Sequence, residues 1–181
     1  MLDDIDEELI SVEQIAQRVA ELGARISDDY RERHLTIIIV SNGAVIFGAD
    51  LVRQITIPLQ LDTISASSYS GTVSRENLDI RSRCKLDVRG RDVVIVDDIL
   101  DTGVTLENLV QAVRDQGAHD VKTCVLLDKQ HDQERGLEAD YAGFHIRDEW
   151  VVGYGLDYNE RYRHLGFVGV LSPACYATPE A

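Results

Sequence analysis

The sequence predicts an α/β fold built on a parallel sheet. Apolar runs occur at 35–40, 93–96 and 121–127, and amphipathic segments separate them. Strands that alternate with helices are typical of parallel sheets, which bind ligands at the carboxyl ends of their strands. The length of 181 residues suits one domain, 1–181, with a sizeable core.

The first half of the chain contains the signals of two helices and two strands. Ser11 and Gln14 fit a capping box at the start of the first helix. Its apolar side chains recur at helical spacing: Val12, Ile15, Val19, Leu22 and Ile26. The strand 35–40 turns at 41–43 into a second helix, and another strand is expected at 59–64. This second helix carries the apolar residues Val45, Phe47 and Leu51.

The second half begins with a long polar loop, 65–77, of a length that often forms a functional lid. The strand 93–96 is central, and the helix after it ends at Gly117. The apolar face of that helix consists of Leu106, Leu109, Val110 and Val113. After the strand 121–127 the pattern changes. Short segments at 144–146, 150–152 and 167–171 predict a small lobe with antiparallel pieces.

Composition excludes several classes of protein. The net charge of −14 argues against a nucleic-acid or membrane-surface binder, although it leaves room for an anionic small substrate. Three separated cysteines, without metal-binding spacing, are expected to be free thiols in a reducing cytoplasm. The acidic N-terminus has no signal-peptide pattern, and no apolar stretch reaches the roughly 20 residues that span a bilayer.

The most informative motif is VVIVDDILDTGVTL, residues 93–106. Asp97 and Asp98 follow the predicted strand, and the small polar residues 101–105 open a helix. Amides at such a corner bind phosphate, whereas the two carboxylates suit a sugar diol or a magnesium ion. The combination indicates an activated ribose phosphate. An ordinary polar turn is the alternative for a lone Asp-Thr-Gly, and the full string disfavours it.

This motif resembles the ribose-phosphate loop of the type I phosphoribosyltransferases, in which two acidic residues precede D-[ST]-G-x-T. The resemblance implies that fold, with a core at about 30–128 and flanking helices. A small hood lobe would combine about 129–181 with the N-terminal segment. It also implies Mg²⁺, ribose contacts from Asp97 and Asp98, and a catalytic role for Asp101 at the purine imidazole ring. The 5′-phosphate would bind the loop Asp101, Thr102, Gly103, Val104 and Thr105.

A second motif, residues 148–160, resembles D-x-[FWY]-V-V-G-Y-G-[IL]-D-Y of the hypoxanthine-guanine branch. Trp150 would stack on the purine and the backbone of Val151 would contact its edge. Asp157 would belong to the base site as well, and would lie near the metal with Asp97 and Asp98. Lys129 would donate to the 6-oxo group. On sequence alone, Trp150 also fits a core anchor, and Lys129 fits a solvated surface charge.

Three further positions complete the resemblance, which runs from about 35 to 171. Arg163 matches a family arginine that reaches the pyrophosphate, and Ser68 and Tyr69 match a Ser-Tyr pair in the family's lid. Asn42 and Gly43 stand where the pyrophosphate loop usually carries a lysine and a glycine, which removes one expected cation. Lys129 is followed by Gln130, where bacterial relatives usually have proline.

The implied reaction joins hypoxanthine or guanine to phosphoribosyl pyrophosphate in purine salvage, giving IMP or GMP and pyrophosphate. A transferase that prefers xanthine and a non-catalytic regulatory paralogue are the alternatives. A homodimer or homotetramer is expected, with neither nucleic acid nor membrane as a partner. The chain lacks the P-loop, zinc-protease, serine-hydrolase and dinucleotide motifs. Its five histidines show no ligand spacing.

Overall fold

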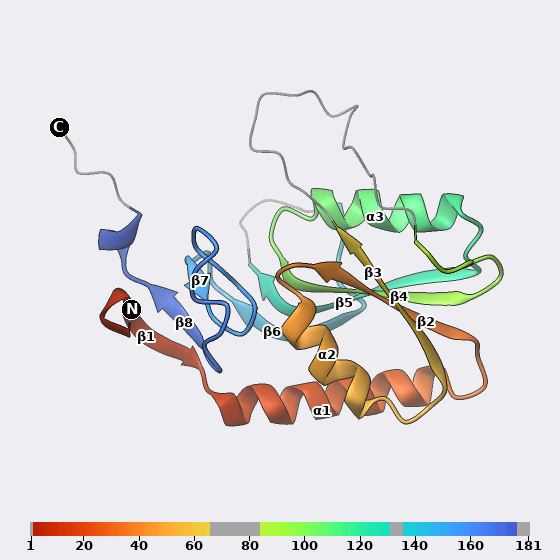
Figure 1. The fold of residues 1–181 in the computed structure, drawn as a ribbon, viewed down its shortest axis with the longest axis horizontal. Helices are drawn as coiled ribbons and strands as arrows, with labels where there is room; N and C mark the ends of the chain where they lie inside the picture. Colours follow the sequence, from red (N-terminus) through yellow and green to blue (C-terminus); the bar gives the residue numbers. More distant parts are fainter. Residues whose placement is uncertain (1, 66–83, 131–135, 177–181) are drawn as a thin grey trace.

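A five-stranded parallel sheet forms the centre of the computed structural model, which describes residues 2–65, 84–130 and 136–176 (Figure 1). The order of its strands is β3-β2-β4-β5-β6, and every neighbouring pair is parallel. The strands are β2 (Leu35–Ser41), β3 (Leu59–Ser65), β4 (Asp92–Leu100), β5 (Asp120–Lys129) and β6 (Tyr141–Ile146). The predicted parallel α/β architecture is therefore confirmed.

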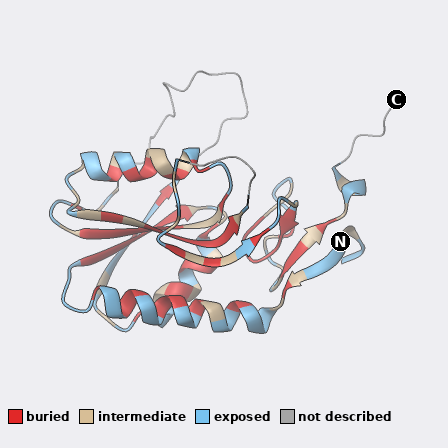
Figure 2. Ribbon diagram, turned by 180° about the vertical axis from the view of Figure 1, so that it is seen from behind, coloured by how far each residue is buried: buried red, intermediate tan, exposed pale blue. Residues whose placement is uncertain are grey.

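Helices cover both faces of this sheet. Helices α1 (Val12–Asp29) and α2 (Val45–Gln54) lie on one face, and α3 (Val104–Asp115) lies on the other (Figure 1). Each helix turns its buried side toward the sheet, which gives one apolar core on each face (Figure 2). The predicted capping box is present, since the Ser11 side chain accepts from the Gln14 amide and the Gln14 side chain accepts from the Ser11 amide. Val12 is exposed and lies outside the core.

A second, three-stranded antiparallel sheet joins the two ends of the chain. It consists of β1 (Ile5–Ile10), β8 (Val168–Leu171) and β7 (Val151–Val152), with β8 in the middle. Short 3₁₀ turns flank it, η1 (Leu2–Asp4) and η2 (Pro173–Cys175). The amide of Ser172 donates to the Asp4 carbonyl at 2.8 Å, and the Tyr162 hydroxyl donates to the Asp4 carboxylate at 2.8 Å.

Two sequence-based boundaries are wrong. The segment 144–146, expected in the antiparallel lobe, belongs to β6, which pairs with β5 and extends the parallel sheet. The strand predicted at 93–96 continues to Leu100, so Asp97 and Asp98 lie within β4 and not after it. The continuation has a physical cause, since β5 still pairs with β4 as far as Leu100 and Asp128.

The carboxyl end of β4 opens away from β2. Pairing between β2 and β4 stops at Ile39 and Val96, whereas β4 continues beside β5. The chain leaves β2 toward β3 on one side and leaves β4 toward β5 on the other, which makes this a topological switch point. Open α/β sheets bind ligands in the crevice at such a point.

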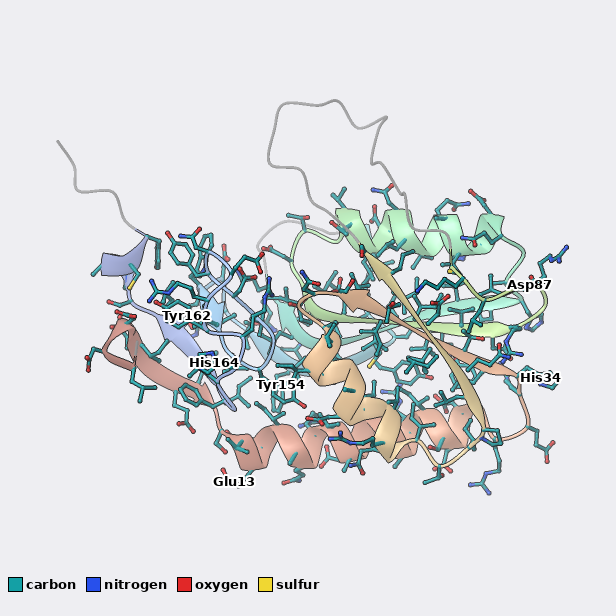
Figure 3. All side chains as sticks on the ribbon, in the orientation of Figure 1. Glu13, His34, Asp87, Tyr154, Tyr162 and His164 are labelled. Atoms are coloured by element: carbon teal, nitrogen blue, oxygen red, sulfur yellow. The ribbon has the colours of Figure 1, made fainter. Side chains whose placement is uncertain are left out.

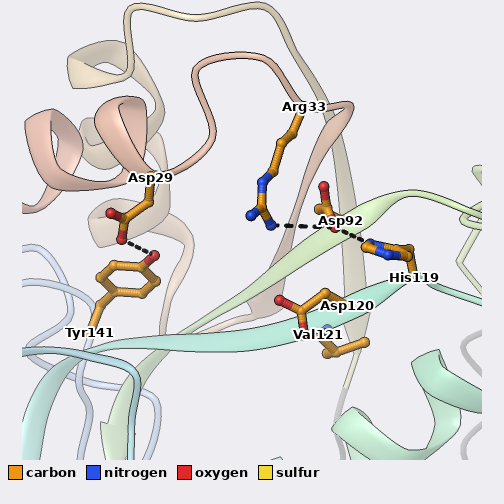
Figure 4. A network of polar contacts seen from close by, with 7 residues as sticks. All are labelled: Asp29, Arg33, Asp92, His119, Asp120, Val121 and Tyr141. Carbon is orange, nitrogen blue, oxygen red and sulfur yellow. Dashed lines mark hydrogen bonds and ion pairs between the residues drawn. The ribbon is translucent and has the colours of Figure 1, made fainter.

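The opposite end of the sheet is held by polar contacts between elements (Figure 4). The Asp92 carboxylate lies 2.7 Å from His119 Nδ1 and 4.0 Å from the Arg33 guanidinium. The Tyr141 hydroxyl donates to Asp29 at 2.7 Å, which ties β6 to α1. Burial raises the pKa of Tyr141. Figure 3 labels His34 and Asp87 at this end, and Tyr154 and Tyr162 on the side of the three-stranded sheet.

Candidate active site

A cavity of about 400 Å³ lies at the carboxyl ends of β2 and β4. It brings together most residues predicted for the ribose, phosphate, pyrophosphate and metal. Its lining includes Asn42, Gly43, Asp97, Asp98, Asp101, Thr102, Gly103, Thr105, Asp157 and Arg163. Of the four residues predicted to bind the base, Asp157 lines this cavity, whereas Lys129, Trp150 and Val151 do not. Val104, which begins α3, does not line it either.

Asp97 and Asp98 form a close pair of carboxylates in this cavity. Burial raises the pKa of both, and the charge of Asp98 raises that of Asp97 further. The Asp97 carboxylate accepts from the Asp98 amide at 3.0 Å. The Asp98 carboxylate accepts from the Ile99 amide at 2.9 Å and fills the space that a side chain at Gly43 would need. This arrangement presents carboxyl oxygens to the cavity, where sugar hydroxyls or a cation would stabilise their charged form.

The loop between β4 and α3 has the features of a phosphate site. Gly103, with a φ of 83°, is the N-cap of α3 and provides no side-chain cap. The first amides of α3 are therefore not capped by the side chain that most N-cap residues supply, and Gly103 and Thr105 both line the cavity. Exposed amides and the positive end of a helix dipole favour a bound phosphate.

The turn after β2 is covered by the turn after β7. The Ser41–Asn42 peptide bond is cis, and Gly43 follows it. Gly155, with a φ of 106°, lies so close that a Cβ there would clash with the Gly43 carbonyl oxygen. The Tyr154 hydroxyl donates to Asp50 on α2 at 2.6 Å. The predicted pyrophosphate loop and the second motif thus support each other directly.

Arg163 links three groups at the rim of the cavity. Its Nη1 donates to the Gly155 carbonyl at 2.7 Å. Its Nη2 lies 2.8 Å from the Asp157 carboxylate and 3.0 Å from that of Glu160. Its positive charge lowers the pKa of Asp98, against the larger effect of burial. Because Arg163 also lines the cavity, its guanidinium brings a positive charge to the rim.

Lys129, at the end of β5, connects the base residues to this cavity. Its ammonium lies 3.0 Å from the Asp148 carboxylate and 3.8 Å from that of Asp101. The side chain is only 12% exposed, so the reading of Lys129 as a solvated surface charge is wrong. Asp148 had no role in the sequence prediction. Its position in the second motif, 19 residues after Lys129, was the available signal.

Trp150 is 47% exposed, so it is not a core anchor. It stacks on Tyr176 with ring centroids 5.4 Å apart and meets Tyr158 edge to face at 5.7 Å. Val151 is buried in β7. The sequence prediction missed both tyrosines as partners of Trp150. Ser68 and Tyr69, predicted for the lid, lie outside the described residues.

The donor set fits a hard divalent cation bound partly through substrate. Within the described residues, no three His, Cys, Asp or Glu side chains gather as a metal-binding group, so Asp97, Asp98 and Asp157 do not form a three-ligand cage. Mg²⁺ usually needs only one or two carboxylates, since waters and substrate phosphates complete its shell. The raised pKa values of Asp97 and Asp98 indicate carboxylates whose charge a cation would stabilise.

Known proteins with related sequences and structures are phosphoribosyltransferases. A family model described as a phosphoribosyl transferase domain matches residues 7–159. Hypoxanthine-guanine phosphoribosyltransferases from Bacillus subtilis and Mycobacterium tuberculosis are 43% and 42% identical, over 97% and 96% of this chain and 98% and 89% of theirs. A hypoxanthine phosphoribosyltransferase structure from Staphylococcus aureus superposes with a TM-score of 0.93 at 36% identity, covering 98% of this chain and 97% of its own.

Proposed function

Since the chain belongs to the phosphoribosyltransferase family, we propose a role for each residue of the cavity in the transfer of ribose phosphate to a 6-oxopurine. The enzyme converts hypoxanthine or guanine, with phosphoribosyl pyrophosphate, into IMP or GMP and pyrophosphate in purine salvage. The observation that carries the assignment is the single cavity that contains two carboxylates, a phosphate loop and Arg163. A sugar diol, a 5′-phosphate and a pyrophosphate need these groups within one site.

Asp97 and Asp98 orient the ribose by accepting hydrogen bonds from its hydroxyls. The anomeric carbon gains positive charge as the pyrophosphate leaves, and the nearby carboxylates stabilise that charge. Asp101 faces the purine imidazole ring and accepts its proton. The ion pair of Asp101 with Lys129, at 3.8 Å, supports this placement because it puts Asp101 next to the base residues.

Loop amides of 102–105 and the hydroxyls of Thr102 and Thr105 hold the 5′-phosphate. Arg163 and the backbone at Asn42 and Gly43 hold the pyrophosphate. One or two of the carboxylates of Asp97, Asp98 and Asp157 would hold Mg²⁺, with substrate oxygens and water as its other ligands, and the bound ion would neutralise the leaving group. The uncapped start of α3 and the position of Arg163 at the cavity support these roles.

The three-stranded sheet and its turns act as the hood over the base. Trp150 stacks on the purine and the Val151 backbone contacts its edge, while Lys129 donates to the 6-oxo group. The near-burial of Lys129 supports a recognition role, because a lysine that only aids solubility gains nothing from desolvation. A homodimer or homotetramer and a cytoplasmic location complete the proposal. Three free cysteines support a reducing compartment.

The double variant Asp97→Asn, Asp98→Asn tests the ribose assignment. Calorimetry should show a loss of affinity for phosphoribosyl pyrophosphate of at least tenfold, because neutral amides replace both anionic acceptors. The circular dichroism spectrum should stay that of the parent. Asp115→Asn, on α3 and away from the cavity, is the control for a lost carboxylate. Parent-like affinity in the double variant would remove the two aspartates from the ribose site.

A further inference from the structure

The ammonium of Lys129 lies between two carboxylates that come from different elements. Asp148 follows β6, and Asp101 belongs to the loop after β4. The distances are 3.0 Å to Asp148 and 3.8 Å to Asp101. Both carboxylates are at least half exposed, whereas the lysine is nearly buried. The ammonium therefore loses water that the two carboxylates must replace.

Only the shorter of these two distances is that of a hydrogen bond. An ammonium has three N–H donors, and a charge-assisted bond to a carboxylate fixes the direction of one of them. At 3.8 Å, Asp101 attracts the charge but does not orient a donor. Asp148 is thus the residue that sets where the remaining donors of Lys129 point.

The register of the sheet explains how Asp148 reaches Lys129. In the pairing of β5 with β6, Lys129 lies beside Ile146, the last residue of β6. Asp148 comes two residues later, and Trp150 two residues after that. One short segment therefore carries both the carboxylate that holds the lysine and the aromatic ring assigned to the purine.

We propose that Asp148 is a positioning residue for base recognition: it holds the Lys129 ammonium so that one donor meets the purine 6-oxo group and the ammonium stays apart from Asp101. The inference rests on the proposed role of Lys129. Without Asp148, Asp101 would be the remaining carboxylate beside the ammonium. A closer ion pair between Lys129 and Asp101 would occupy both the N–H that donates to the 6-oxo group and the carboxylate that accepts the imidazole proton.

Asp148→Asn is the first test, read by calorimetry with the nucleotides IMP and AMP. IMP carries the 6-oxo group and AMP carries an amine in its place. The variant should bind IMP roughly tenfold more weakly, because the charge-assisted bond to Lys129 is lost, with little change for AMP. Asp148→Glu should recover part of the affinity. Glu149→Gln, which removes the same charge one residue away, should leave both affinities unchanged.

Lys129→Met separates an effect through the lysine from a structural effect. If Asp148 acts through Lys129, then Lys129→Met alone and the double variant with Asp148→Asn should bind IMP equally weakly. A further loss in the double variant would overturn the inference. Parent-like binding by Asp148→Asn, with weak binding by Lys129→Met, would also overturn it and leave the proposed function intact. Parent-like IMP binding by Lys129→Met would instead contradict the proposed role of Lys129.

Discussion

The buried Asp97 carboxylate destabilises the folded protein when it is charged, and a bound cation or sugar would offset this effect. Its folded-state pKa is raised, first by burial and then by the charge of Asp98, so the native protein holds this proton to a higher pH than the unfolded chain does. Stability from this group is therefore complete below the unfolded pKa of about 4 and is lost as the pH rises through the folded value. Ligand-free protein is destabilised by Asp97 at neutral pH.

Asp97→Asn should consequently raise the melting temperature of ligand-free protein at pH 7, by roughly 2–4 °C for each kcal/mol relieved. The difference from the parent should shrink toward pH 4, where the parent carboxyl is protonated. Scanning calorimetry across this range measures both effects. Asp87→Asn is the opposite control. Hydrogen bonds from Arg89 lower the pKa of Asp87 to about 2, so loss of this charge should not raise the melting temperature at pH 7. A parent-like or lower melting temperature for Asp97→Asn at pH 7 would contradict this account.

Asn42 leaves the proposed pyrophosphate loop without a side-chain cation, although it lines the cavity that contains Arg163. Asn42→Lys should tighten pyrophosphate binding by ~1 kcal/mol, which is a lower inhibition constant by roughly fivefold. Product inhibition by pyrophosphate at fixed Mg²⁺ measures the change. Gln60→Lys adds the same charge on β3, outside this cavity, and should have no effect. Equal constants for Asn42→Lys and its parent would place residue 42 away from the pyrophosphate.

Single residues in the two long motifs could be predicted because each motif fixes both residue type and spacing. Seven predicted residues of these motifs line one cavity in the structure. Asp148 could not be assigned, because its contact with Lys129 depends on the register between β5 and β6. A sequence interpretation that put 144–146 in the antiparallel lobe had no reason to bring these residues together. The stacking of Tyr176 on Trp150 likewise depends on the path of the chain after β8.

At the scale of elements, the turn after β7 positions the turn after β2. Gly155 approaches the Gly43 carbonyl too closely for any side chain. Gly155→Ala should therefore displace the pyrophosphate loop and raise the KM for phosphoribosyl pyrophosphate, by about tenfold if one loop contact of ~1.4 kcal/mol is lost. Steady-state kinetics with hypoxanthine in excess measures the change.

Gly90→Ala is the matched control for backbone strain. Gly90 also has a positive φ, of 68°, but no atom lies within 4 Å of a Cβ placed there. Alanine at either position costs about 1–2 kcal/mol for the left-handed conformation, whereas only Gly155→Ala should change the KM. An equal KM in both variants would mean that the approach of Gly155 to Gly43 does not position the loop.

Elements with a buried, periodic pattern could be predicted, and those that depend on distant partners could not. The strands 35–40 and 121–127 are nearly continuous in buried residues, which a parallel sheet covered on both faces requires. Strand β1 was missed because IDEELI is acidic and largely exposed, and its partner β8 lies at the far end of the chain. Strand propensity is weak evidence in such a case.

Over the whole molecule, the proposed site takes residues from both sheets. The parallel sheet contributes Asp97 and Asp98, and the loop after β4, at its switch point. The segment from β6 to β8 contributes Trp150, Val151 and Arg163. Lys129 lies where these parts meet, since it pairs with Asp101 on one side and Asp148 on the other. None of the helices in the described part of the chain could span a membrane.

The central claim is that this site joins a 6-oxopurine to an activated ribose phosphate. The most direct test is a spectrophotometric assay of hypoxanthine, guanine, xanthine and adenine, each with phosphoribosyl pyrophosphate and Mg²⁺. Hypoxanthine and guanine should be converted, and kcat/KM for adenine should be lower by roughly 10⁴-fold, since an ammonium cannot accept a hydrogen bond from the adenine amine. Adenine used as efficiently as hypoxanthine, or no turnover of either 6-oxopurine, would contradict the account.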